Sequence, residues 1–194
     1  AMMNIWGVGR VKAKELVNEG YDRIGSVRHS IKQGRLKLER SQYIGVLCYE
    51  DIMEEMPRSE VEAIADILLS TVRDRYPSAE MTIMGSYRRG KLSSGDVDIM
   101  ITHPDFPDTV PPKALGQIVD ELRSKGHIAH HLTFIAGMKP EKYESLPTSL
   151  GYERPHEKKD KLNQSSWMGV FNSPVIAGKR RRVDIKFYPY RHRV

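Results

Sequence analysis

The chain has 194 residues, of which 39% are hydrophobic and 29% charged, so it can form one domain or two small ones. Lysine and arginine exceed aspartate and glutamate by 31 to 25, and the resulting net charge of +6 favours an anionic partner. The one cysteine, Cys48, excludes an internal disulfide, and no apolar run reaches bilayer length, which argues against membrane insertion.

The first predicted element is a glycine-containing turn that leads into an amphipathic helix, within residues 4–17. A dinucleotide-binding loop would need a strand before Gly7-Val8-Gly9 and a third glycine where Lys12 stands. The pattern is more typical of a helix-hairpin-helix motif, whose glycines let a tight turn offer backbone N–H groups to a DNA phosphate. An ordinary turn between two helices is the alternative interpretation. One side of the helix is expected to be buried, and its apolar residues are Val8, Val11, Leu16 and Val17.

Three more helical segments are predicted before the central part of the chain. Residues 20–27 predict a turn and a short helix, and residues 36–49 a further helix. Residues 59–75 carry apolar side chains at three- and four-residue spacing, which predicts a helix that packs against a sheet. Pro57 to Ser59 marks the start of this helix, and Tyr76-Pro77 marks its end.

The central stretch, residues 84–102, is interpreted as an active site. A short apolar run enters the Gly85-Ser86 turn, and a second apolar run then carries Asp96 and Asp98. Side chains alternate along a strand, so the two carboxylates lie on one face while their apolar neighbours point into a core. Paired carboxylates that repel one another suit Mg²⁺ or Mn²⁺. A hairpin with two exposed aspartates is the alternative.

The segment between the two apolar runs is basic and rich in glycine, which suits a triphosphate. Gly85 and Ser86 offer backbone N–H groups at a turn, and Gly90 and Gly95 allow close approach. Positive charge comes from Arg88, Arg89 and Lys91.

The second half of the chain predicts a proline-rich loop at 102–112, a helix at 114–125 with Gly126 as its C-cap, and a polar surface loop at 137–164. Strands are expected at 128–135, 167–171 and 182–188. His103 and Cys48 are expected to be structural. The other histidines lack the spacing of a metal site and are expected to be solvated; they are His127, His130, His131 and His156.

Gly85-Ser86, a basic spacer and Asp96-x-Asp98 resemble the signature of polymerase-beta-like nucleotidyltransferases. The longer string from Gly85 to Asp98, followed by residues 101–104, resembles the family X DNA polymerases of the beta and lambda kind. That family takes a third carboxylate from a later strand, and residues 179–186 match it with Asp184. By the same resemblance, Arg182 precedes the third aspartate and orients the catalytic carboxylates.

The resemblance implies nucleotidyl transfer with two Mg²⁺ or Mn²⁺ ions held by Asp96, Asp98 and Asp184. A deoxynucleoside triphosphate (dNTP) is the implied substrate, and the positions that match its phosphate-binding residues are Gly85, Ser86, Arg89, Ser94 and Gly95. The hairpin would grip the primer strand, and its implied DNA-binding residues are Gly7, Gly9, Arg10 and Lys12. Backbone atoms of Met3, Ile5 and Val8 match a site for Na⁺ or K⁺.

The implied fold class is α+β. A small all-α helix-hairpin-helix subdomain, residues 1–56, is expected to precede a nucleotidyltransferase palm, residues 57–194. The palm is expected to have a mixed sheet with two helices on one face, its strands passing through Ile83, Val97, Phe134, Val170 and Ile185. The chain is expected to be a polymerase core without the lyase and C-terminal subdomains of the family.

The function implied is that of a DNA-directed DNA polymerase that fills gaps in base excision repair. A template-independent terminal-type nucleotidyltransferase and a catalytically inert DNA-binding fragment are the alternatives. The expected partners are gapped or primer-template DNA and dNTP, with no membrane, and the chain is expected to be a monomer in the nucleus or the mitochondrion. The basic run Lys179 to Arg182 has three interpretations: a solvated hairpin, an approach to a nucleic-acid backbone, or a nuclear-localisation patch.

Overall fold

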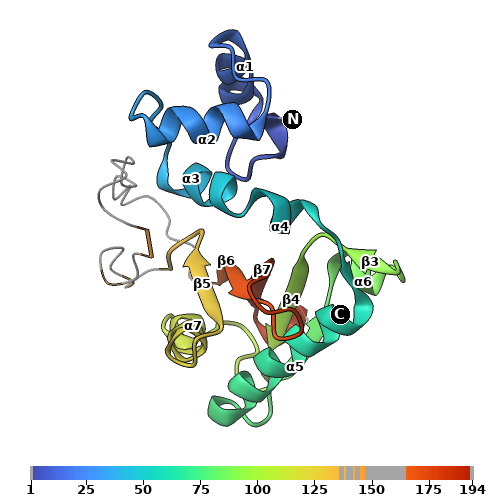
Figure 1. Cartoon of the computed structure of the whole chain (residues 1–194). Helices are drawn as coiled ribbons and strands as arrows, with labels where there is room; N and C mark the ends of the chain where they lie inside the picture. Colours follow the sequence, from blue (N-terminus) through green and yellow to red (C-terminus); the bar gives the residue numbers. More distant parts are fainter. Residues whose placement is uncertain (1, 136–137, 139–141, 143–144, 147–164, 193–194) are drawn as a thin grey trace. The chain divides into compact units, whose positions relative to one another are not determined.

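The computed structural model describes residues 2–135, 138, 142, 145–146 and 165–192 (Figure 1). The chain divides into two compact units, one of residues 1–53 with 145–160 and one of residues 54–144 with 161–194. No helix in the described ranges combines the length and the apolar character needed to cross a bilayer.

The first unit is helical. A short 3₁₀ helix, η1 (Met2–Asn4), precedes α1 (Arg10–Asn18), α2 (Ile24–Lys32), α3 (Arg40–Leu47) and α4 (Tyr49–Met53). Its core consists of buried side chains from η1, the turn, α1, α2 and α3. The expectation of a buried side is confirmed for Val8 and Leu16 but is wrong for Val11 and Val17, which are exposed.

The turn between η1 and α1 packs on α3, because a Cβ at Gly45 would lie 2.5 Å from the carbonyl oxygen of Trp6. Gln42 Nε2 also donates a hydrogen bond of 3.1 Å to the carbonyl oxygen of Gly7.

The helix expected at 36–49 is shorter than predicted. Glu39 and Gln42 form a capping box, so α3 begins at Arg40, and Leu36 and Leu38 are buried in the extended segment before it. Cys48 ends α3 and is 1% exposed, as its expected packing role requires.

The second unit is built on a five-stranded sheet of order β2-β4-β7-β6-β5. The strands are β2 (Glu80–Ile83), β4 (Val97–Thr102), β5 (Ile128–His131), β6 (Ser166–Asn172) and β7 (Arg180–Phe187). Only the β4–β7 pair of this sheet is parallel, so the sheet is mixed. A smaller sheet pairs β1 (Met56–Pro57) with β3 (Ser93–Ser94), and α6 (Gly85–Arg88) and η4 (Tyr190–His192) complete the unit.

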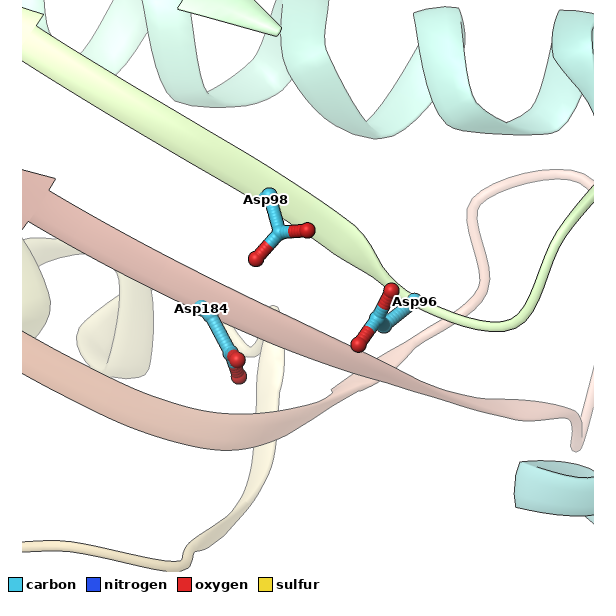
Figure 2. A group of neighbouring side chains, drawn as sticks. All are labelled: Asp96, Asp98 and Asp184. Carbon is cyan, nitrogen blue, oxygen red and sulfur yellow. The ribbon is translucent and has the colours of Figure 1, made fainter. Parts of the chain in front are cut away.

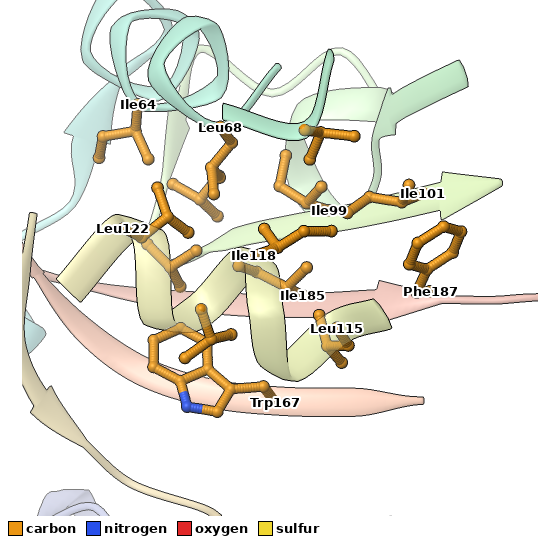
Figure 3. Packing of buried hydrophobic residues seen from close by; sticks show 14 of the residues in the cluster. Ile64, Leu68, Ile99, Ile101, Leu115, Ile118, Leu122, Trp167, Ile185 and Phe187 are labelled. Carbon is orange, nitrogen blue, oxygen red and sulfur yellow. The ribbon is translucent and has the colours of Figure 1, made fainter. Parts of the chain in front are cut away.

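Two helices, α5 (Arg58–Arg75) and α7 (Ala114–Ser124), share one apolar core with the sheet (Figure 3). From β4 and β7 the core takes alternate residues, which therefore lie on one face of the sheet; they include Val97, Ile99, Ile101, Val183, Ile185 and Phe187. The predicted α+β class, with a mixed sheet and helices, is confirmed. The predicted ends of α5 and α7 lie within one residue of the observed ends. Gly126 follows α7 with a φ of +80°, as a glycine at the end of a helix often does.

The strand expected at 128–135 ends early, at His131. The N–H groups of Leu132 and Thr133 both donate to the carbonyl oxygen of Met168, so the regular ladder cannot continue. Phe134 consequently lies outside the strand on which it was expected, although it packs against the core. Most of the loop expected at 137–164 lies outside the described residues.

The expectation of solvated histidines is wrong for His130 and His131, which are 7% and 2% exposed. His131 Nδ1 accepts a hydrogen bond of 3.1 Å from the indole N–H of Trp167, so this histidine belongs to the core. His127 is half-buried, and His156 lies outside the described residues. His103 is buried as expected, and its Nδ1 accepts from the N–H of Asp105.

Candidate active site

Three carboxylates meet at the centre of the large sheet. Asp96 precedes β4, Asp98 lies on β4, and Asp184 lies on β7 directly beside Asp98 in the parallel ladder. Each offers one oxygen, and these three oxygens all lie within 4.8 Å of one another. Figure 2 shows the three side chains converging from the two strands. The alternation of side chains places this cluster on the sheet face opposite the helices.

Arg182 bridges the carboxylates across the two strands. Its Nη2 donates to Asp96 Oδ2 and, at 3.2 Å, to Asp184 Oδ2. One guanidinium therefore holds two of the three acids in a fixed orientation, as a bridging arginine can. The structure thus brings together all four residues that were predicted to be catalytic.

Burial and mutual repulsion disfavour the ionised forms of Asp98 and Asp184 while the cluster holds no cation. Burial chiefly raises the pKa of Asp184 to about 6, and Asp96 and Asp98 add to the effect while Arg182 opposes it. Burial and the Asp96 charge also raise the pKa of Asp98, against the positive charges of Lys186, Arg182 and Arg89. The carboxylates would be stabilised by a counter-charge beyond the one that Arg182 supplies.

The donor set fits a hard divalent cation. Asp184 Oδ1 is buried and has no hydrogen-bond partner within the described part of the chain. A buried, unsatisfied carboxylate oxygen is rare in folded proteins, and a bound ion at that position would satisfy it. All three donors are carboxylate oxygens, which Mg²⁺ and Mn²⁺ prefer.

Gly85 allows the neighbouring loop to pass close beside Asp98. Its φ is +61°, and a Cβ there would lie 2.2 Å from Asp98 Oδ2. The N–H of Met84 donates to the carbonyl oxygen of Asp98 at 2.8 Å, which fixes the loop against β4. The turn expected at Gly85-Ser86 is in fact the first part of the short helix α6, and glycine is the residue that its start requires.

The other candidate phosphate-binding residues follow Gly85 along the same loop. Ser86 Oγ donates a hydrogen bond of 2.8 Å to Ser94 Oγ, so the two hydroxyls lie together. Arg89 is close enough for its charge to lower the pKa of Asp98. A Cβ at Gly95 would have no atom within 4 Å, so close packing does not explain a glycine at that position.

Arg58 fixes this loop from α5, and the sequence interpretation missed it. Its Nη1 donates to the carbonyl oxygens of Tyr87 at 2.9 Å and Lys91 at 3.1 Å. Its guanidinium also lies 3.6 Å from the centre of the Tyr87 ring, in cation–π geometry. These contacts join residues about thirty positions apart, and no local pattern in the sequence signals them.

The basic run Lys179 to Arg182 includes one side chain that is buried rather than solvated. Arg181 is 1% exposed and forms a two-pronged ion pair with the fully buried Glu60, with N–O distances of 2.8 and 3.0 Å. Lys179 pairs with Glu54 at 2.5 Å. Solvation and contact with a nucleic-acid backbone are both wrong for Arg181, and sequence reasoning also missed Glu60.

Comparison with known proteins identifies the family to which the chain belongs. Residues 55–190 match a family model described as DNA polymerase beta palm, and residues 1–53 match one described as the fingers domain of DNA polymerase lambda. The chain belongs to the family X DNA polymerases. The expected family is therefore confirmed.

Two polymerases of this family, both named DNA polymerase lambda, align with almost the whole chain. The rat protein is 27% identical over 187 residues, which are 96% of this chain and 27% of the rat protein. The Arabidopsis thaliana protein is 26% identical over 185 residues, which are 95% of this chain and 30% of the plant protein. The chain thus spans less than a third of the length of either relative.

The part of this family X chain that matches the fingers domain contains the candidate hairpin. Gly7 has a φ of +82°, which favours glycine, and a Cβ at Gly9 would have no atom within 4 Å. Gly9 precedes α1 as its N-cap, and Arg10, the first residue of α1, is exposed. Lys12 forms an exposed ion pair with Glu15 at 3.2 Å.

The carbonyl groups expected to bind a monovalent cation lie in and after η1. The carbonyl oxygen of Ile5 accepts a hydrogen bond of 3.0 Å from the N–H of Val8, which leaves one of its lone pairs for another partner. Met3 is exposed, whereas the side chains of Ile5 and Val8 are buried in the core of the unit. The monovalent site at Met3, Ile5 and Val8 stays a prediction.

Proposed function

We propose that the protein is a DNA-directed DNA polymerase that transfers a deoxynucleotide to a primer 3′-hydroxyl. The observation that carries the proposal is the cluster of Asp96, Asp98 and Asp184, bridged by Arg182, in a chain that matches a polymerase palm over residues 55–190. The DNA polymerases lambda that align with this chain support the same class of reaction.

Asp96, Asp98 and Asp184 would together hold two Mg²⁺ or Mn²⁺ ions. Bound there, the ions would supply Lewis-acid stabilisation of the attacking and leaving oxygens. Arg182 keeps Asp96 and Asp184 in a common orientation, and its charge favours the ionised form of Asp184.

In the proposed reaction a bond forms between the primer 3′-oxygen and the α-phosphorus, and the bond from that phosphorus to the β-phosphate oxygen breaks. Pyrophosphate leaves, and the hydroxyl proton must go to a base. Asp184 is the candidate acceptor, because its carboxylate belongs to the cluster at which the primer hydroxyl would react.

The segment of residues 85–95, which begins with α6, would bind the triphosphate. The paired hydroxyls of Ser86 and Ser94 and the guanidinium of Arg89 suit the β- and γ-phosphate oxygens. Backbone N–H groups of Gly85 and Gly95 would complete the binding site. Gly85 also keeps the loop beside Asp98, so phosphate and carboxylates would face one another.

The hairpin of the first unit would bind the DNA backbone through N–H groups around Gly7 and Gly9, with positive charge from Arg10 and Lys12. A K⁺ or Na⁺ ion on the carbonyls of Met3, Ile5 and Val8 would strengthen that contact. The match to the fingers domain of DNA polymerase lambda over residues 1–53 supports this assignment.

Gap filling in base excision repair, as a monomer in the nucleus, is the specific role that we propose, with the mitochondrion as the alternative location. A fluorescent fusion of the gene product at its natural level tests the location. Recovery of the signal in mitochondria alone would refute a nuclear role.

The test of the reaction uses a one-nucleotide-gapped duplex and the matching labelled dNTP with Mg²⁺. We expect metal-dependent dNTP binding and templated incorporation by the wild-type chain, and loss of both in Asp96→Ala plus Asp98→Ala. Asp66→Ala, on the exposed side of α5, is the matched control and should retain both.

Each outcome separates one function from the others. Incorporation that needs no templating strand would indicate a terminal-type transferase instead. DNA binding that is unaffected by metal and by the double substitution, without any dNTP binding, would leave only a DNA-binding module.

A further inference from the structure

The start of β7 extends beyond its ladder with β4. That ladder begins at the pair Val97 and Val183, whereas Arg180, Arg181 and Arg182 pair only with β6. Arg182, which contacts Asp96 and Asp184, therefore stands on a part of β7 that has one neighbouring strand. This strand end is held by one ladder instead of two, so a further contact there adds to its constraint.

Arg181 supplies that contact on the opposite face of the sheet. Its Nε donates to Glu60 Oε1 at 2.8 Å and its Nη2 to Glu60 Oε2 at 3.0 Å, while its Nη1 donates to the carbonyl oxygen of Glu54 at 3.0 Å. Both side chains of the ion pair are at most 1% exposed. The first turn of α5 and the start of β7 are thereby fixed to one another.

Glu60 also fixes the other side of the β6–β7 turn. Ser173 Oγ, one residue after β6, donates to Glu60 Oε1 at 2.6 Å. One buried carboxylate thus binds the chain both before and after the turn that leads into β7. Burial by itself would raise the pKa of Glu60, but hydrogen bonds from Arg181 and Ser173 outweigh it and lower that pKa, so the group is ionised at neutral pH.

Consecutive residues of a strand point to opposite faces, so the two-pronged contact of Arg181 sets the rotation of the backbone at Arg182. We propose that Glu60 is a positioning residue, which holds Arg181 and thereby keeps Arg182 in contact with Asp96 and Asp184. The proposal rests on the proposed function, since it concerns the orientation of the same metal-binding carboxylates. It adds a residue on the far side of the sheet that touches neither metal nor substrate.

The physical consequence is a change in metal affinity. If Glu60 loses its charge, the buried guanidinium of Arg181 keeps the more distant Glu54 carboxylate, at 3.4 Å, as an ionic partner, and the start of β7 shifts with Arg181. Arg182 then no longer holds Asp96 and Asp184 together. Substitution of a residue that orients metal ligands typically weakens metal affinity about 10- to 100-fold.

The experiment measures Mn²⁺ binding to the full chain by the loss of the free-ion electron paramagnetic resonance signal. The variants are Glu60→Gln, Arg182→Gln and the two together, with Asp66→Asn on the exposed side of α5 as the matched control. We expect Glu60→Gln to weaken Mn²⁺ binding about 10-fold or more. In the Arg182→Gln background, Glu60→Gln should have no further effect, because its influence passes through Arg182.

Arg181→Lys is the second variant, because Glu60→Gln can lose its fold. Lysine keeps the charge opposite Glu60 but cannot form the two-pronged contact, so it should also weaken Mn²⁺ binding while circular dichroism shows a folded chain. Wild-type Mn²⁺ affinity in Arg181→Lys would overturn the proposal. Equal losses from Glu60→Gln in both backgrounds would also overturn it, because the effect would then bypass Arg182.

Failure of the proposed function has a different signature. If the wild-type chain itself binds no Mn²⁺, the metal site fails, and the role of Glu60 fails with it. If the wild type and Asp66→Asn bind Mn²⁺ and Glu60→Gln binds it equally well, only the role of Glu60 fails.

Discussion

The substitution Asp184→Asn is expected to stabilise the metal-free chain at neutral pH. Burial, with help from Asp96 and Asp98, raises the pKa of Asp184 from its ordinary value of 3.8 to about 6. The folded chain therefore holds this proton more tightly than the unfolded chain does, and ionisation of Asp184 costs stability. That cost is fully present above about pH 6 and disappears below about pH 3.8.

The size of the cost follows from the same pKa difference. Each unit of difference in pKa between the folded and the unfolded chain corresponds to about 1.4 kcal/mol, so the free-energy cost of ionising Asp184 is about 3 kcal/mol. Asparagine is neutral at every pH and resembles the protonated acid in shape. We therefore expect the free energy of unfolding of Asp184→Asn to exceed that of the wild type by up to about 3 kcal/mol at pH 7.5. For a chain of this size, that is a rise in Tm of up to roughly 6–12 °C.

The assay is thermal and urea unfolding in a chelator between pH 4 and pH 8, followed by circular dichroism. The advantage of Asp184→Asn should shrink as the pH falls and vanish near pH 4, whereas Asp66→Asn, an exposed control, should show no such trend. Added Mn²⁺ should reverse the order, because ligand at about 1,000 times its Kd stabilises the wild type by about 4.1 kcal/mol, which exceeds the advantage of the variant. A variant that is less stable than the wild type at pH 7.5, or a difference that does not depend on pH, would refute the reasoning.

Two glycines carry further predictions. Gly85→Ala should abolish Mn²⁺ and dNTP binding in calorimetry, because the new Cβ would lie 2.2 Å from Asp98 Oδ2. Gly116→Ala, on α7 with open space around it, is the control, and equal behaviour of the two variants would contradict the argument. Gly45→Ala should weaken binding of gapped duplex DNA, measured by fluorescence anisotropy, because its Cβ would lie 2.5 Å from the carbonyl oxygen of Trp6 and displace the hairpin. Unchanged DNA affinity in Gly45→Ala would mean that the hairpin is not the DNA contact.

Elements with local signals could be predicted from the sequence. The apolar spacing in residues 58–75 and 114–124 predicts α5 and α7, and proline and glycine mark ends that the structure places within one or two residues of the expectation. The early end of β5 could not be predicted, because it depends on two N–H groups that turn to the carbonyl oxygen of Met168 on another strand. The burial of His131 has the same kind of cause, since its partner, Trp167, is 36 residues away.

In the candidate site, too, features with a local signal could be predicted and features that depend on distant residues could not. The relation of Gly85 to Asp98 lies within one short stretch, and alternation along a strand is enough to place Asp96 and Asp98 on one side. The position of Asp184 depends on parallel pairing of β4 with β7, and its candidacy came from the family resemblance rather than from spacing. The contact of Arg181 with Glu60 spans 121 residues, so a run of four basic residues looks solvated until the fold is known.

The position of the three acids within the sheet explains how a costly cluster can be kept in place. β4 lies between β2 and β7, and β7 lies between β4 and β6, so both strands that carry the acids are internal. Their opposite faces contribute fully buried side chains to the main core, which resists small displacements. Repulsion among the acids therefore acts against the most constrained strands of the unit. Only the start of β7 lies outside the β4 ladder, and that is where the buried pair of Arg181 and Glu60 supplies the missing constraint.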